Sequence, residues 1–165
     1  MSEANRIRPE HARARAAVVT SPAGRLVLVA EGDALVRLHW GESDLPEATA
    51  DPLLAEARDQ LAAYFAGRLT RFILPLAPRG SPFMRQVWDA LLTIPYGRTT
   101  TYGALAATVG STARAVGRAV GANPIPIVIP CHRVLGADGR LTGYSGAGGL
   151  ATKRRLLIHE GALLC

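Results

Sequence analysis

The sequence predicts an α+β fold: a small N-terminal β-meander, an antiparallel sheet with one helix, followed by a mainly helical C-terminal domain containing a helix-turn-helix. Three observations carry this prediction. Short Val- and Leu-rich segments alternate with turn residues up to residue 40, helical spacing dominates from residue 81, and only Gly110-Ser111 separates two short helical segments. With 165 residues, the chain can bury one sizeable core or two small ones.

The first half of the chain reads as three strands, one helix and a further strand. Residues 1–15 are polar and arginine-rich, and we expect a mobile arm without a signal peptide. AAVVT, RLVLVA and ALVRLHW are predicted strands, because Val and Leu recur between Pro- and Gly-containing turns. Asp51 is the predicted cap of a helix that begins at Pro52 and ends before Gly67. LTRFILPLAP, residues 69–78, is predicted as one more strand.

The composition changes near residue 80, where we place a boundary between an N-terminal structural domain, residues 16–80, and a second domain, residues 81–165. The second domain contains four helical segments, FMRQVWDALLTI, TYGALAATV, TARAVGRAV and LATKRRLLIHE. Arg114 and Arg118 are the only large polar side chains of the third segment, which therefore has little with which to read base edges in a major groove. Its Ala and Gly residues suit either close approach to a narrow groove or tight packing in the core.

The net charge of +6 is one-sided. Residues 1–80 carry 10 basic and 10 acidic groups, whereas residues 81–165 carry 9 basic and 3 acidic groups. Such a field favours a polyanion such as nucleic acid, although 18 of the 19 basic residues are Arg, so that a general arginine bias explains the charge equally well. Cys131 and Cys165 have no paired spacing and no histidine cluster near them, so we expect a reduced, cytoplasmic protein without a metal site or a membrane span.

Cys131 and His132 lie near the end of an apolar segment that is stiffened by three prolines, residues 123–134 (NPIPIVIPCHRV). This pattern indicates a nucleophilic cysteine, and we expect His132, Arg133 and the basic surroundings to lower the pKa of the thiol. The commoner alternative for a single cysteine is a buried, inert side chain. Because neighbours on an extended strand point to opposite faces, contact between Cys131 and His132 would require a turn at Pro130 or a bridging water.

The PCHRV motif, with IPYGRTTTYGALAATVG and RAVGRAVGANPIP before it and LTGYSG and LLIHEG after it, resembles the O6-alkylguanine-DNA alkyltransferases, or methylated-DNA–protein-cysteine methyltransferases. The resemblance covers roughly residues 81–161, and the strand-rich half resembles the family's N-terminal domain in layout. It implies DNA repair by irreversible, stoichiometric transfer of the alkyl group of O6-alkylguanine to Cys131, with O4-alkylthymine as a second candidate lesion. Double-stranded DNA is the implied partner, with no cofactor and no obligate protein partner.

The resemblance also assigns the residues that carry the chemistry. Cys131 is the alkyl acceptor, His132 takes the thiol proton through a water, and Glu160 orients the imidazole, as in a Cys-His-acid triad. Asn123 matches the hinge asparagine that ties the helix-turn-helix to the active-site segment. Tyr102 matches the tyrosine that donates to the base ring and assists the departure of an anionic purine. The neighbouring His159 is left outside the site.

Further positions bind the flipped base and the duplex. The main-chain carbonyl of Val134 would accept from the exocyclic amine, the amide of Ser145 would face O6, and Tyr144 would form a wall of the pocket. Arg114 matches the arginine that fills the gap left by the flipped nucleotide, inserted from the minor groove. The implied DNA-contacting set is Ala113, Arg114, Gly117, Arg118 and Arg133.

The loop at residues 144–150 is about two residues longer than the family's usual spacing between its tyrosine and lysine, so the size of the pocket stays open. Three alternatives are also open. An alkyltransferase-like lesion-binding protein would flip the base without transfer, but such proteins lack the cysteine present here as Cys131. A helix-turn-helix transcription regulator would need more base-reading side chains. A cysteine hydrolase would need a hydrolysable intermediate, which a thioether is not.

Overall fold

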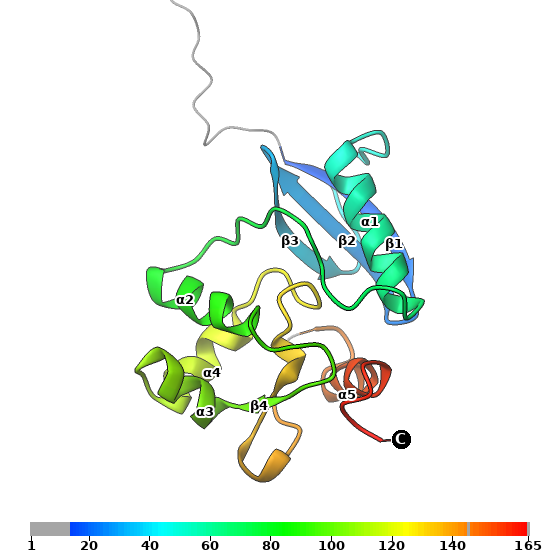
Figure 1. The fold of residues 1–165 in the computed structure, drawn as a ribbon. Helices are drawn as coiled ribbons and strands as arrows, with labels where there is room; N and C mark the ends of the chain where they lie inside the picture. Colours follow the sequence, from blue (N-terminus) through cyan, green and yellow to red (C-terminus); the bar gives the residue numbers. More distant parts are fainter. Residues whose placement is uncertain (1–13, 145, 165) are drawn as a thin grey trace, which may run out of the picture.

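The computed structural model describes residues 14–144 and 146–164. The predictions for residues 1–13, Ser145 and Cys165 lie outside this part of the chain. Three strands, β1 (Arg15–Ser21), β2 (Gly24–Glu31) and β3 (Ala34–Trp40), form an antiparallel sheet in chain order, as predicted (Figure 1). Two-residue turns connect them, since Ser21 pairs with Gly24 and Glu31 with Ala34. Arg15, assigned above to the arm, already belongs to β1.

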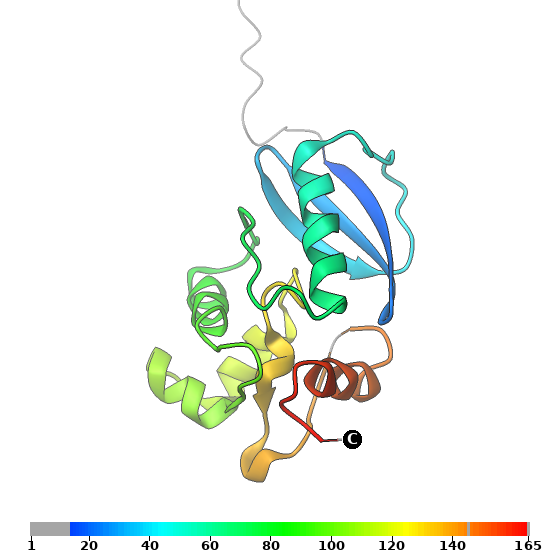
Figure 2. The ribbon, with the colours of Figure 1, turned by 45° about the vertical axis from the view of Figure 1, so that its right-hand side comes forward.

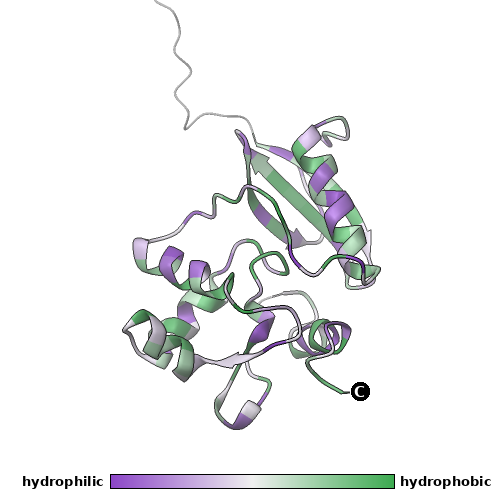
Figure 3. Ribbon diagram, viewed as in Figure 1, coloured by the Kyte–Doolittle hydropathy of each residue, from purple (hydrophilic) through white to green (hydrophobic). Residues whose placement is uncertain are grey.

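One helix, α1 (Pro52–Phe65), covers one face of this sheet (Figures 1 and 2). The Asp51 side chain accepts from the Leu54 amide at 3.0 Å, which satisfies one of the free donors at the helix start. The chain leaves the helix through Gly67, whose φ of +75° suits glycine, so the predicted bounds are confirmed. The apolar face of the helix meets the apolar strands, which Figure 3 colours green, and the buried contact residues are Leu26, Leu28, Leu35, Leu38, Leu54, Ala57 and Leu61.

Residues 69–78 do not form the predicted strand. Its one bridge to the sheet among the described residues is to Leu35 of β3, whose amide donates to the Pro75 carbonyl at 2.8 Å and whose carbonyl accepts from the Ala77 amide at 2.9 Å. Pro75 has no amide hydrogen to donate to residue 33, so the ladder cannot extend beyond this bridge in that direction. The segment is instead part of the extended connection from α1 to the second half of the chain.

The second half is mainly helical, as predicted. Ser81, Thr101 and Thr112 cap the first three helices by accepting hydrogen bonds from backbone amides three residues further on. The helices are α2 (Pro82–Leu91), α3 (Tyr102–Val109), α4 (Ala113–Gly121) and α5 (Leu150–His159). A short parallel pair, β4 (Thr100–Thr101) with β5 (Val134–Leu135), and two 3-10 turns, η2 (Cys131–Arg133) and η3 (Ala137–Gly139), were not predicted.

One hydrophobic core runs through both halves of the chain. In the helical half, the indole of Trp88 on α2 is buried and donates to the Ala119 carbonyl on α4 at 2.8 Å, which fixes these two helices together. Between the halves, the β3 amide of Leu38 donates to the Pro124 carbonyl at 2.9 Å. Arg155 of α5 donates to the Pro22 carbonyl in the β1–β2 turn at 2.6 Å. Along the described residues, no helix is long and apolar enough to cross a membrane.

Candidate active site

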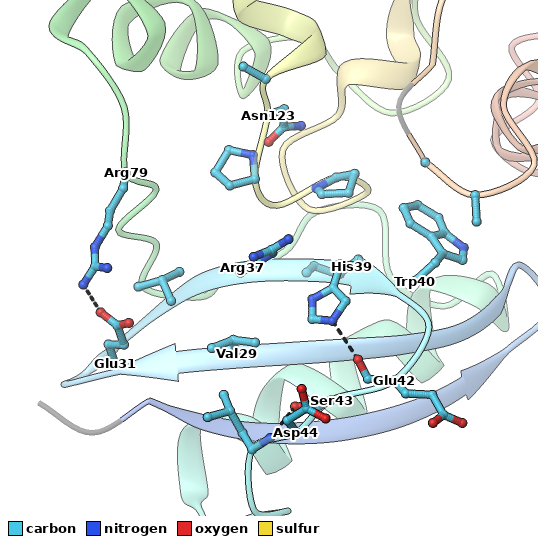
Figure 4. Close-up of a pocket in the computed structure, with 18 of the residues that line it drawn as sticks. Val29, Glu31, Arg37, His39, Trp40, Glu42, Ser43, Asp44, Arg79 and Asn123 are labelled. Atoms are coloured by element: carbon cyan, nitrogen blue, oxygen red, sulfur yellow. Dashed lines mark hydrogen bonds and ion pairs between the residues drawn. The ribbon is translucent and has the colours of Figure 1, made fainter.

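The segment that carries Cys131 is held in one shape by Asn123 and by its prolines. The Asn123 side chain is buried, donates from Nδ2 to the Ile129 carbonyl at 2.8 Å and accepts at Oδ1 from the Ile125 amide at 3.0 Å. Ile127 between them has a φ of +73°, which a β-branched residue rarely adopts, so the surrounding contacts must impose it. Asn123 therefore joins the end of α4 to the segment that presents the thiol (Figure 4).

Cys131 lies in the 3-10 turn η2 and is only 3% exposed. Burial raises the pKa of its thiol to about 11, although a hydrogen bond with Asn123 and the positive charge of Lys153 oppose the shift. The expectation that basic surroundings lower this pKa is therefore wrong, because desolvation outweighs the nearby charge. Cys131 is thus a neutral thiol at neutral pH, and a reaction at its sulfur requires a base.

The imidazole of His132, the base expected from the sequence, is held in one orientation. The turn at residues 131–133 replaces the extended strand, and the imidazole is fully buried. Its Nε2 lies 2.8 Å from Oε1 of Glu160, and its Nδ1 has no hydrogen-bond partner among the described residues. With Nε2–H donated to the carboxylate, Nδ1 is the acceptor nitrogen of the neutral ring. Burial lowers the pKa of His132 in spite of Glu160, so the imidazole is neutral and can take a proton.

Glu160 is the shared partner of three buried side chains. Arg133 donates to it from Nε and Nη2, each at 2.9 Å, and Tyr64 of α1 donates from its hydroxyl at 2.8 Å. Burial alone would raise the pKa of the carboxyl, but hydrogen bonds from His132 and Arg133 outweigh it and lower the pKa to about 2. The carboxylate is therefore ionised at every pH at which the protein would work.

Arg133 does not lie on a surface that DNA can reach. Its side chain is buried, its guanidinium is paired with Glu160, and Nη1 donates to the Ile94 carbonyl at 2.6 Å. The prediction that Arg133 contacts DNA is therefore wrong. The sequence did not show that Glu160 would lie beside it. His159, left outside the site, is paired with the Tyr64 carbonyl at 2.8 Å.

Cys131 lines a small cavity of about 110 Å³. Two aromatic side chains of the predicted site, Tyr102 from the start of α3 and Tyr144, are also in its lining, together with Gly117 of α4. Burial raises the pKa of both tyrosines, so each hydroxyl stays protonated and able to donate. Ser145 lies outside the described residues.

Lys153 is a part of this site that sequence reasoning missed. It is fully buried on α5, and its ammonium group donates to the carbonyls of Val134, Thr142 and Gly143 at 2.6, 2.8 and 3.2 Å. Burial lowers its pKa to about 8. The bond to Val134 occupies one lone pair of the carbonyl that was assigned to the base. One signal was present in the sequence, since Lys153 is the single lysine in a chain that otherwise uses arginine.

The outer face of α4 leads to the cavity. Ala113 and Arg114 are exposed near the start of the helix, Arg118 is exposed one turn later, and Val116, Ala119 and Val120 face the core. A second hollow of about 420 Å³ is lined by Ala113, Gly117 and Tyr102, and the latter two also line the cavity that holds Cys131. A path of small residues therefore connects this arginine-bearing face to the thiol.

The described side chains offer no group of three or more His, Cys, Asp or Glu residues placed to hold a metal ion. A buried thiol with an oriented His-Glu pair, reached from an exposed arginine-bearing helix face, defines the class: a protein with a cysteine nucleophile and a surface suited to nucleic acid. Residues 82–162 match the family model for the DNA binding domain of 6-O-methylguanine DNA methyltransferase, and residues 15–78 match that for its ribonuclease-like domain. The chain belongs to this family.

Known members of the family are similar to this chain in sequence and structure over most of its length. It is 49% identical over 149 residues to the methylated-DNA–protein-cysteine methyltransferase of Mycobacterium tuberculosis (strain ATCC 25618 / H37Rv), covering 86% of this chain and 89% of the relative. It is 44% identical over 138 residues to the constitutive enzyme of Bacillus subtilis (strain 168), covering 77% and 84%. The crystal structure of Mycobacterium tuberculosis OGT in complex with DNA superposes with a TM-score of 0.82 at 45% identity, covering 90% and 93%. The resemblance stated from the motifs and the α+β fold class are both confirmed.

Proposed function

We propose that the chain repairs double-stranded DNA by transferring the alkyl group of O6-alkylguanine to Cys131, once per molecule and without a cofactor. The observation that carries the proposal is the placement of Cys131 in a small cavity, next in sequence to an imidazole whose Nε2 lies 2.8 Å from Oε1 of Glu160. The names of the relatives, methylated-DNA–protein-cysteine methyltransferases, support the same activity. A cytoplasmic location is part of the proposal.

The chemistry follows from the protonation states of these groups. Nδ1 of His132 takes the thiol proton through a water, and Glu160 stabilises the resulting imidazolium. The sulfur then forms a bond to the alkyl carbon as the bond between that carbon and O6 breaks, leaving the electron pair on the purine. The purine takes up one proton and becomes guanine, so the reaction balances as thiol plus alkylguanine giving thioether plus guanine. Tyr102 assists, because its protonated hydroxyl, which donates to the Thr142 carbonyl at 3.4 Å in this structure, can turn to donate to the purine as negative charge develops.

The DNA interface is assigned to α3 and α4, acting as a helix-turn-helix in a domain of residues 81–165, while residues 16–80 support it. The alkylated base cannot react inside the stack, so it must rotate into the cavity. Arg114, exposed near the start of α4, is assigned to fill the gap, with Ala113, Gly117 and Arg118 against the backbone. Small residues on this face permit close approach without reading sequence, which suits repair in any context.

The test is a comparison of transfer and binding in two variants, Cys131→Ser and Cys131→Ala. We expect both to bind a duplex with one O6-methylguanine and to leave the methyl group on the DNA, because the rest of the pocket is unchanged. Cys131→Ala with residual transfer would refute the assignment. Wild-type protein that binds the lesion without transfer would favour a lesion-binding protein instead.

A further inference from the structure

Trp40, the last residue of β3, lies beside the loop that follows Tyr144, one of the residues that line the cavity at Cys131 (Figure 4). Its ring meets the ring of Tyr144 edge-to-face, with 6.1 Å between centroids and 82° between planes. Its indole N–H donates to the Ala23 carbonyl in the β1–β2 turn at 3.0 Å. The indole is therefore fixed from the sheet side while its ring packs against a wall of the cavity.

Gly146 lies in the corner between these two rings. A Cβ on Gly146 would lie 2.4 Å from Cε1 of Tyr144 and 2.8 Å from the ring of Trp40, distances that real side chains do not tolerate. Beyond Gly146 the loop is tied to α5, since the Thr152 hydroxyl donates to the Ala147 carbonyl. The position of the loop is thus set by contact with Trp40 at one end and by α5 at the other.

A cavity of about 1000 Å³ opens on another side of Trp40, between the sheet and residues 121–126 (Figure 4). Trp40, Gly146 and Ala147 all line it. A smaller side chain at position 40 would therefore give the loop open volume to move into. The cavity at Cys131 is only about 110 Å³, and Tyr144 is one of its walls, so a small shift of Tyr144 changes a large share of its space.

We propose that Trp40 determines the size of alkyl group that the cavity at Cys131 accepts, by holding Tyr144 in place as one of its walls. The inference rests on the proposed function, since it concerns the same cavity. Trp40 is a positioning residue, because it acts through Tyr144 rather than by contact with the alkyl group. A side chain of the strand-rich half thereby sets the specificity of a reaction carried out in the helical half.

The test compares single-turnover rate constants of Trp40→Leu and wild type on duplexes that carry O6-methylguanine or O6-benzylguanine at one position. The ratio of the benzyl to the methyl rate constant is expected to rise roughly three- to tenfold, the order that an aromatic pair contributes. Trp40→Phe keeps a ring beside Tyr144 and is expected to restore most of the wild-type ratio. Arg155→Ala is the matched control, because it removes the contact between Arg155 and the Pro22 carbonyl, also between the halves, without touching Tyr144.

A ratio within about twofold of wild type in folded Trp40→Leu overturns the inference, as does an equal loss of both rate constants. A matching rise in Arg155→Ala also overturns it, because any loosening between the halves would then suffice. If Trp40→Leu does not fold, Trp40→Met is measured in its place, with the same outcomes. Wild-type protein that transfers neither group overturns the proposed function, and this inference with it, whereas transfer with an unchanged ratio overturns the inference alone.

Discussion

Replacing Glu160 by Gln removes one negative charge from a buried cluster and keeps its shape. The carboxylate accepts four hydrogen bonds, from His132, Tyr64 and twice from Arg133. Its pKa is about 2 in the folded chain and 4.5 in a free side chain. At about 1.4 kcal/mol per pKa unit, the charge stabilises the fold by about 3 kcal/mol above pH 4.5. Leaving Arg133 buried without its partner gives a cost of the same order, about 3–5 kcal/mol.

The sign of the pH dependence follows from the lowered pKa. The contribution of Glu160 is present above the unfolded pKa and is lost as pH falls through the folded value. Urea unfolding of Glu160→Gln and wild type should therefore differ by about 3 kcal/mol near pH 6, and the difference should shrink steadily below about pH 4.5. Transfer should slow by about 10²–10⁴, because the imidazolium loses its counter-charge.

Glu56→Gln is the matched control, because Glu56 is exposed on α1 and its loss should change neither quantity. A difference in unfolding free energy below about 0.5 kcal/mol at pH 6 would refute the reasoning. So would a difference of constant size from pH 6 to pH 3, because it would show that the carboxyl does not titrate as a paired, buried group.

Three further predictions follow from the same geometry. Arg114→Ala should slow transfer from a duplex by about 10-fold or more and leave the reaction with free O6-benzylguanine unchanged, since only the flipping step is lost; equal losses would contradict this. Lys153→Met should lower the unfolding free energy by about 1–3 kcal/mol in urea titrations, because the buried Val134 carbonyl loses its donor, as do the part-buried carbonyls of Thr142 and Gly143, and a neutral result would count against it. Because burial lowers the pKa of His132, the transfer rate should stay constant from about pH 7 to 6.5, a range below the pKa of about 8 of Lys153. A rate already halved at pH 6.5 would contradict that protonation state.

Local sequence signals were sufficient for most of the elements. Asp51-Pro52 and Gly67 gave both ends of α1, because capping and left-handed backbone depend on single residue types. The strand predicted at residues 69–78 was wrong because its formation depends on residues far away in the sequence. That segment has the apolar composition of a strand, yet Pro75 lacks the amide that would extend the ladder, and its one bridge to the sheet, at Leu35, depends on a residue far away in the sequence.

The site was predictable where a motif names the residue and unpredictable where a partner is remote. The PCHRV motif identified Cys131, but its raised thiol pKa comes from burial, which the motif does not encode. The sequence predicted Arg133 as a surface charge, whereas the structure pairs it with Glu160, 27 residues further along the chain. Tyr64 and Trp40 reach the site from the strand-rich half across 96 and 104 positions of sequence, to Glu160 and Tyr144 respectively, and no local pattern reports such contacts.

The most direct test of the account is the intact mass of the wild-type protein after mixing with a duplex that carries one O6-methylguanine, followed by peptide mapping. A gain of one methylene unit is expected, located on Cys131 and saturating at one group per molecule. A lesion-bound protein of unchanged mass, or a methyl group found on another residue, would contradict it.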